Sequence, residues 1–269
     1  MKHSNHHSNL LESFYIAHNI RFLKVGTGKF YDKLGDVYED YIAAVFEASR
    51  CARYNKILRG EVPIGSMDEE VAFQILNKAG VSCIESVEIR GVPKRESGGE
   101  PKTDVWAVIN GNDHVKMSIK QSKASNVTVA EFDVQTIAEE VGIEDHRLLS
   151  LLEKFQTDAS AKYFTFEEKI RLGKLLAPHL RPFLNWVLSG CREDTSDNPQ
   201  HANLMVMFKT NHAGTLVGLG VETLSECFEH LTSRSAGYGT GLSWTYATGT
   251  KGKKIQFKAP VTKPQVVWG

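Results

Sequence analysis

Helix-like and strand-like segments alternate along this chain without a regular βαβ rhythm, and this pattern restricts the fold class more than any other feature. Helices are indicated by capping signals and helical spacing of apolar residues, and strands by short alternating runs. The predicted helices are 36–58, 66–80, 128–141, 145–155, 165–176, 179–188 and 223–233, and the predicted strands are 86–92, 103–109, 114–121, 203–209 and 215–221. We therefore expect an α/β (α+β) fold with a central mixed sheet flanked by helices.

The bulk properties of the chain fit one globular domain. Its 269 residues and 30.0 kDa can bury a substantial core, and no low-complexity linker divides them, so we expect a single domain over 1–269. Residues 1–30 are expected to begin as a polar, partly mobile segment without the apolar core of a signal peptide. No apolar run approaches the roughly 20 residues that cross a bilayer, and four scattered cysteines favour reduced thiols. These features predict a cytoplasmic protein with no membrane partner.

The segment 230–269 is strongly basic. It contains one arginine and five lysines but no Asp or Glu, and because the whole chain is neutral, the first 229 residues carry a net charge of −6. Such asymmetry can place a cationic surface on a neutral protein, and nucleic acid is the obvious polyanion. A solvated lysine-rich hairpin is the alternative explanation.

The same segment reads as folded rather than as a basic tail. Trp244 and Tyr246 alternate with polar residues, as do Ile255 and Phe257 further on, so they look like the inward faces of two strands around a turn. The opposite face would then carry Thr245, Gln256 and Lys258. We therefore expect a folded C-terminal basic hairpin, and a DNA-reading role if its cationic surface meets nucleic acid.

An acidic residue and a lysine occur on two neighbouring predicted strands. Asp104 lies near the start of the first strand, and Ser118 and Lys120 lie near the end of the second. Residues two apart share one strand face, so Ser118 and Lys120 point the same way while Ile119 points into the core. A carboxylate supplies hard oxygen ligands for Mg²⁺, and a lysine can stabilise charge on a phosphate or position the attacking water. The pair suits phosphodiester hydrolysis, although solvated charges at strand ends are the simpler reading of so short a motif.

Sharing one face also constrains the connection between these strands. In an antiparallel pair, Asp104 lies on the side of Ser118 and Lys120 only if paired residue numbers have an even sum, for example with Asp104 opposite Lys120. We therefore expect a three-residue connection at Gly111–Asp113, or a bulge, rather than a two-residue loop.

Four longer blocks resemble the MspI-type restriction endonucleases. They are Lys120–Ser122, Val127–Ile137, Ser160–Thr165 and Gly237–Lys258, in the family's order, within a resemblance that runs from about Leu34 to Lys258. The family implies a PD-(D/E)xK nuclease fold, Mg²⁺ as the divalent metal, and cleavage of double-stranded DNA at the palindrome CCGG. It also implies a cognate DNA methyltransferase as a functional companion.

The resemblance assigns the active-site residues. Asp104 matches the metal-binding aspartate and Lys120 the catalytic lysine, and we place the metal at Asp104 and Ile119. Ser118 departs from the family, which has Asn there, and from the wider superfamily, which has Glu or Asp. A hydroxyl is a poorer metal ligand than a carboxylate, so another carboxylate could substitute. Glu39, which matches a family glutamate, is one candidate, and Glu131 is the other, although a capping box with Thr128 also explains Glu131.

The resemblance also assigns residues that contact DNA. Thr128 matches such a position, and the lysines between the two C-terminal strands would contact phosphates rather than bases. The full DNA-binding set is Thr128, Glu131, Thr245, Thr248, Lys251, Lys253, Lys254, Gln256 and Lys258. Lys and Gln can pair with base edges in the major groove. The leading prediction is thus a type II restriction endonuclease, and the alternatives are a non-catalytic DNA-binding protein or a weakly nicking or repair nuclease.

Overall fold

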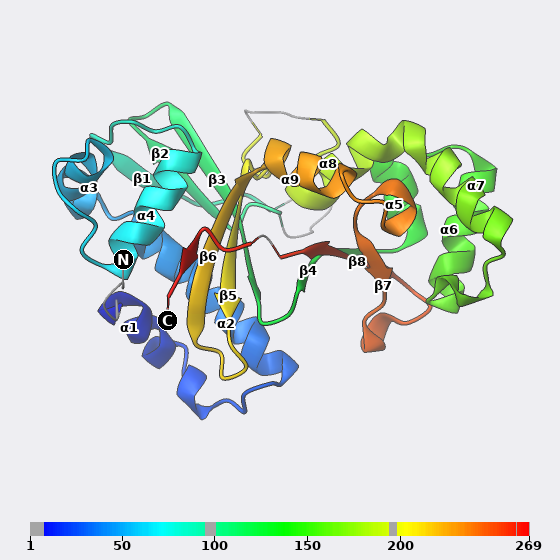
Figure 1. Ribbon diagram of the computed structural model, residues 1–269, viewed down its shortest axis with the longest axis horizontal. Helices are drawn as coiled ribbons and strands as arrows, with labels where there is room; N and C mark the ends of the chain where they lie inside the picture. Colours follow the sequence, from blue (N-terminus) through cyan, green and yellow to red (C-terminus); the bar gives the residue numbers. More distant parts are fainter. Residues whose placement is uncertain (1–7, 95–100, 194–197, 262, 269) are drawn as a thin grey trace. The chain divides into compact units, whose positions relative to one another are not determined.

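The computed structural model describes residues 8–94, 101–193, 198–261 and 263–268 (Figure 1). The chain divides into two compact units, each assembled from separate segments. The first unit comprises Met1–Ala124, Ala202–Thr223 and Thr262–Gly269, and the second comprises Ser125–His201 and Leu224–Val261. Whether they act as one domain, as expected for 1–269, stays a prediction.

The first unit is built on a mixed six-stranded sheet. Its strands follow the order β1-β2-β3-β5-β6-β9. Their bounds are β1 Val87–Arg90, β2 Val105–Ile109, β3 Asp113–Ser122, β5 Leu204–Thr210, β6 Leu216–Thr223 and β9 Val266–Val267. The β3–β5 pair is parallel and every other pair is antiparallel, so the prediction of a central mixed sheet with helices around it is confirmed.

Helix α2 (Gly28–Val45) covers the apolar face of this sheet. It packs against β2 and β3, and Tyr38 stacks on Phe208 of β5 with ring centroids 4.3 Å apart. Alternate residues of β2 and β3, including Ala107, Met117 and Ile119, are buried in the same hydrophobic core. Ile119 therefore points into the core, as predicted from strand alternation.

The predicted helix 36–58 is wrong at its start and in its middle. Helix α2 begins eight residues earlier, where the Thr27 hydroxyl accepts a hydrogen bond from the amide of Phe30. It ends at Val45, whose carbonyl accepts from the Tyr54 hydroxyl at 2.6 Å, and a short 3₁₀ turn separates it from α3 (Cys51–Leu58). The apolar stripe continued across this break, so the spacing of residues alone could not reveal it.

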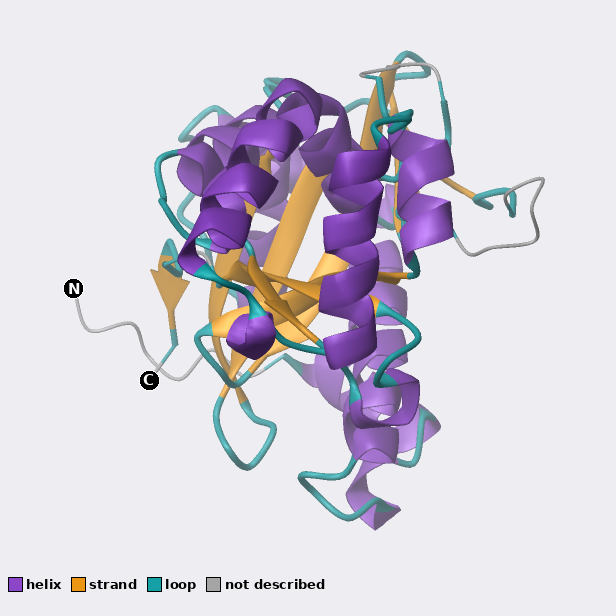
Figure 2. Cartoon of the chain, turned by 90° about the vertical axis from the view of Figure 1, so that its right-hand side faces the viewer, coloured by secondary structure: helices purple, strands orange, loops and turns teal. Residues whose placement is uncertain are grey.

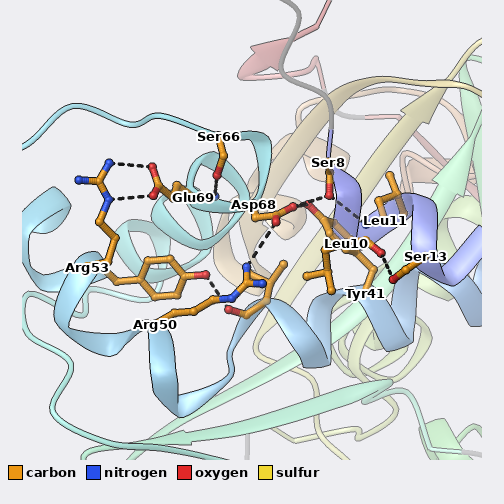
Figure 3. A network of polar contacts seen from close by, with 12 residues as sticks. Ser8, Leu10, Leu11, Ser13, Tyr41, Arg50, Arg53, Ser66, Asp68 and Glu69 are labelled. Atoms are coloured by element: carbon orange, nitrogen blue, oxygen red, sulfur yellow. Dashed lines mark hydrogen bonds and ion pairs between the residues drawn. The ribbon is translucent and has the colours of Figure 1, made fainter.

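A polar network links the helices of the first unit around Asp68, near the start of α4 (Met67–Lys78) (Figure 3). The Asp68 carboxylate accepts hydrogen bonds from Ser8 and Tyr41 and pairs with Arg50 at 3.3 Å. Ser8 is also the N-cap of α1 (Asn9–Ala17), where its hydroxyl accepts from the amide of Leu11. The network thus connects α1 to α2 and α4, and part of the segment expected to be polar and partly mobile is helical.

Within its described residues, the second unit contains a three-stranded sheet and five α-helices. Its strands follow the order β4-β8-β7, with bounds β4 Asn126–Phe132, β7 Ser243–Thr245 and β8 Ile255–Pro260. Its α-helices are α5 Val134–Val141, α6 His146–Asp158, α7 Phe166–Leu176, α8 Leu180–Ser189 and α9 Leu224–Thr232. Figure 2 distinguishes the helices and strands of the chain by colour. None of the helices described in either unit is long and apolar enough to cross a membrane.

Aromatic side chains form the buried side of the three-stranded sheet. Trp244 lies edge-on to Phe257 and to Phe155, with centroids 5.1 and 5.4 Å apart, and Phe183 of α8 packs edge-on against Phe257. Trp244 is half-buried and packs against this aromatic core, as expected. The expectation for Tyr246 is wrong, because it follows β7, is 37% exposed and carries the Lys251 ammonium 5.4 Å from its ring centroid.

The predicted capping box of Thr128 and Glu131 is also wrong. Both residues lie on β4, and α5 begins only at Val134, with Asp133 as its N-cap accepting from the amide of Thr136 at 2.8 Å. The local signature suited a helix start, but pairing with β8 and burial of the apolar β4 side chains favour a strand.

Candidate active site and DNA-binding surface

The β2–β3 hairpin has the even register that a shared face requires. Ile109 pairs with Asp113, leaving a three-residue connection over 110–112. The predicted connection length is confirmed, but the loop lies one residue earlier than expected. Asn110 adopts a positive φ of 52°, and its side chain accepts from the amide of Glu85 and donates to the carbonyl of Cys83. This anchoring explains why Asn110 belongs to the loop.

The register brings Asp104 to Ser118 rather than to Lys120. The Asp104 amide donates to the carbonyl of Met117 at 2.8 Å, so the pairing with β3 continues one residue before the start of β2. Its carboxylate Oδ2 accepts from the Ile119 amide at 2.6 Å and from Lys120 Nζ at 3.0 Å, and Ser118 Oγ is 3.5 Å away. Four candidate residues therefore meet at one carboxylate.

Two oxygens converge on the Lys120 ammonium. Besides Asp104 Oδ2, the main-chain oxygen of Ile119 lies 2.8 Å from Lys120 Nζ. The Asp104 and Lys120 side chains are only 18% and 20% exposed, and Ser118 is buried. A positive group thus already sits between a carboxylate and a carbonyl in a partly buried site, which is the environment that a hard cation needs.

Glu39 of α2 belongs to the same site. Burial, the negative charge of Asp104 and other nearby carboxylates raise its pKa to about 7, with Lys120 opposing the shift. Glu39 and Asp104 line one pocket of about 490 Å³ in the first unit, together with Arg90 and residues of the segments around it. The sequence had named Glu39 as a substitute carboxylate, and the structure places it beside Asp104.

The residues present fit a divalent ion of the magnesium type. Within the described ranges, no group of three or more His, Cys, Asp or Glu side chains forms a ready-made metal cluster. Asp104 Oδ2 and the Ile119 carbonyl nevertheless supply two hard oxygens, and Glu39 adds a carboxylate nearby. Mg²⁺ commonly takes one or two protein carboxylates and completes its shell with water and phosphate oxygens. Such a donor set suits Mg²⁺ better than a soft metal.

A β-bulge gathers the candidate DNA-binding residues on one face of the three-stranded sheet. Thr128 pairs with Lys258 and Glu131 with Gln256, although an unbroken ladder would place residues 128 and 131 on opposite faces. The register shifts between Thr128 and Ala130, so one extra residue, Val129, restores the common face. Thr245 of β7 lies opposite Gln256 and joins them.

The other side of the sheet explains why this face is polar. Ile255, Phe257 and Ala259 of β8 are buried, whereas Gln256 and Lys258 between them are partly exposed. The predicted alternation in β8 is therefore confirmed.

The β7–β8 connection carries the remaining candidates. Thr248 and the three lysines of this connection are exposed, and Thr248–Thr250 forms a 3₁₀ turn. These residues are Thr248, Lys251, Lys253 and Lys254. They belong to the same unit as Thr128, Gln256 and Lys258.

Glu131 is hydrogen-bonded within this face. Its Oε2 accepts from Gln256 Nε2 at 2.9 Å, and its Oε1 accepts from Thr250 Oγ1 at 2.5 Å. Glu131 lies in the second unit and Asp104 in the first. Sequence reasoning missed Thr250 because a contact across 119 positions leaves no local signal, and it missed Arg90 because nothing in a short exposed strand marks an arginine as a pocket residue.

Comparisons with known proteins agree with this geometry. The family model for restriction endonuclease MspI matches residues 20–259. The type II restriction enzyme MspI from Moraxella sp. is 32% identical over 242 residues, covering 84% of this chain and 89% of that protein. A crystal structure of restriction endonuclease MspI in complex with its cognate DNA matches with a TM-score of 0.80 and 30% identity, covering 94% of this chain and 99% of that one.

These similarities define the class of the protein as a type II restriction endonuclease, a site-specific deoxyribonuclease. Within that class, the chain belongs to the MspI restriction endonuclease family.

Proposed function

We propose that this enzyme cleaves double-stranded DNA at CCGG and that the hydrolysis depends on Mg²⁺ held at Asp104 and Ile119. The observation that carries the proposal is the convergence of Asp104 Oδ2 and the Ile119 carbonyl on one cationic position, at 3.0 and 2.8 Å from Lys120 Nζ. The MspI structure with its cognate DNA supports the choice of duplex DNA as substrate.

Each residue of the first-unit site has a distinct role in this proposal. Asp104 and the Ile119 carbonyl would hold the metal, which would supply polarisation of the scissile phosphate and a lowered pKa for water bound to it. The Lys120 ammonium stands at this position in the structure, so it would shift when the metal binds and place its positive charge where the phosphorane-like transition state gains negative charge. Glu39, with its pKa raised to about 7, can hold or release a proton at neutral pH beside Asp104.

Ser118 separates this proposal from its alternatives. A neutral hydroxyl contributes less to metal binding than a carboxylate, so a protein that binds DNA without cutting it, or that nicks it, is the second candidate. The proximity of Glu39 to Asp104 favours catalysis, because it supplies the carboxylate that Ser118 does not.

The polar face of the three-stranded sheet is proposed to read the DNA. Gln256 and Lys258 would contact base edges, and Lys251, Lys253 and Lys254 would neutralise phosphates. A cytoplasmic location and a companion methyltransferase that protects CCGG complete the proposal.

Plasmid cleavage tests the function directly. Purified protein is incubated with plasmid DNA in Mg²⁺ and, as the control, in EDTA, and the fragment ends are sequenced. Discrete fragments with ends at CCGG support the proposal, relaxed circles support nicking, and intact DNA that still shifts on a gel supports binding alone. The Asp104→Ala variant serves as the matched negative control.

A further inference from the structure

We propose that Glu131 is a positioning residue that fixes the orientation of the side-chain amide of Gln256. This orientation would determine which base edge Gln256 recognises. The inference rests on the proposed DNA-reading role of the polar face of the three-stranded sheet. It assigns Glu131 a role in sequence discrimination instead of metal binding.

The geometry leaves the Gln256 amide one orientation. Glu131 and Gln256 are directly opposed across β4 and β8, and Glu131 Oε2 accepts from Gln256 Nε2 at 2.9 Å. A carboxylate only accepts hydrogen bonds, so Gln256 must present its NH₂ group to Glu131. Its Oε1 and one remaining N–H are then left for another partner.

This orientation has a consequence for base recognition. In the major groove, the groups that can donate to a glutamine oxygen are the amino groups of cytosine and adenine. A glutamine with the opposite amide orientation would offer a donor in the same place and would suit a guanine or thymine oxygen instead. Glu131 fixes the orientation of the Gln256 amide before DNA binds. Gln256 therefore loses less side-chain entropy when the complex forms.

The charge of Glu131 is unfavourable for general DNA binding. It lies on the face that carries Lys258, and it accepts a hydrogen bond from Thr250, which directly precedes Lys251 in the β7–β8 connection. A negative group on a surface that meets phosphates weakens binding to every sequence alike. Removing this charge should therefore strengthen binding to non-cognate DNA while weakening discrimination.

Thr250 provides a matched control. Its hydroxyl donates to the other oxygen of Glu131 at 2.5 Å, so it shares the carboxylate with Gln256 but does not orient the amide. Thr250→Val should remove this contact and leave the Glu131–Gln256 hydrogen bond in place.

The test measures equilibrium binding by fluorescence anisotropy, with EDTA present to prevent cleavage. The probes are a labelled CCGG duplex and duplexes with one base pair of that site changed. For Glu131→Gln, the ratio of non-cognate to cognate Kd should fall about tenfold, within the range for one lost base contact, and non-cognate binding should be tighter because a negative charge is removed. Thr250→Val should keep the ratio within about twofold.

A double-mutant cycle separates positioning from other roles. In a Gln256→Ala background, Glu131→Gln should change the ratio by less than about twofold, because the amide it orients is absent. The exchanged variant Glu131→Gln/Gln256→Glu keeps a hydrogen-bonded pair across the strands and should fold normally, yet it should not recover discrimination.

The outcomes are distinguishable. The inference is overturned if the exchanged variant recovers discrimination. It is also overturned if Glu131→Gln lowers the Kd ratio equally in the wild-type and Gln256→Ala backgrounds, because Glu131 would then have a structural role or contact DNA directly. If the Glu131→Gln variant discriminates as well as the wild-type protein, the inference is also overturned, but the proposed function is not affected. Equal binding of all duplexes by the wild-type protein refutes the DNA-reading function itself, and this inference with it.

Discussion

Replacing Glu39 with glutamine should stabilise the metal-free protein at high pH. The pKa of Glu39 is raised from 4.5 to about 7 in the folded state, first by burial and then by the charge of Asp104. A carboxyl group whose folded-state pKa is raised makes no unfavourable contribution below pH 4.5, where it is protonated in both states. Its unfavourable contribution grows as pH rises from 4.5 to about 7 and is complete above that.

The magnitude follows from the size of this pKa difference. At about 1.36 kcal/mol per tenfold change, the difference between 4.5 and about 7 corresponds to at most ~3.4 kcal/mol. Glu39 keeps part of its surface in water, where solvent screens the charges, so we expect about 1–2 kcal/mol.

Urea unfolding in EDTA at two pH values measures this effect. Glu39→Gln should be more stable than wild type by about 1–2 kcal/mol at pH 8 and equally stable near pH 4.5. Comparing the two proteins at each pH cancels the titration of all other groups. Excess Mg²⁺ should shrink the difference at pH 8, since a cation beside Asp104 favours the ionised carboxylate. A variant no more stable than wild type at pH 8 would refute the placement of Glu39 beside Asp104.

Three further predictions follow from the two sites. Asp104→Ala and Lys120→Ala should each abolish plasmid cleavage while keeping the Kd for cognate DNA within about tenfold of wild type, because both residues act on metal and phosphate. Near-normal cutting by either variant would refute the proposed active site. Lys258→Ala should lose about 1–3 kcal/mol of discrimination against a one-base mismatch, whereas Lys253→Ala should weaken binding to all sequences and lower the salt slope by about one. Deleting Val129 should give a regular β4–β8 ladder in which Thr128 and Glu131 lie two positions apart on the same face and keep Lys258 and Gln256 as partners, so discrimination should survive while thermal stability falls with the loss of a buried side chain; loss of discrimination would show that the bulge shapes the DNA-reading face beyond setting its register.

Strand periodicity predicted the geometry around Asp104 and Lys120 more fully than helix signals predicted the helices. The requirement that Asp104, Ser118 and Lys120 share a face gave both the even register and the three-residue hairpin. It could not give the position of the loop, because that depends on side-chain hydrogen bonds of Asn110 to a distant segment.

The errors arose where tertiary contacts overrode local signals. Thr128 and Glu131 have the spacing of a capping box, but their backbone pairs with β8 more than a hundred residues later. Helix 36–58 kept its apolar stripe across a real break, which Tyr54 stabilises by donating to Val45. The target sequence and the matches of single residues to metal-binding and DNA-contacting positions came from the family resemblance, because composition and spacing carry no target sequence.

The interleaving of the two units has a consequence for protein engineering. The second unit consists of two insertions into the first, one between the parallel neighbours β3 and β5 and one between β6 and β9. A chimaera that exchanges the three-stranded sheet proposed to read DNA must therefore transplant 125–201 and 224–261 together, across four junctions. Moving the basic hairpin alone would separate β8 from its partner β4 and leave an unpaired strand edge. New target specificities in this scaffold should thus be easier to reach by point changes on the polar face than by exchange of one contiguous cassette.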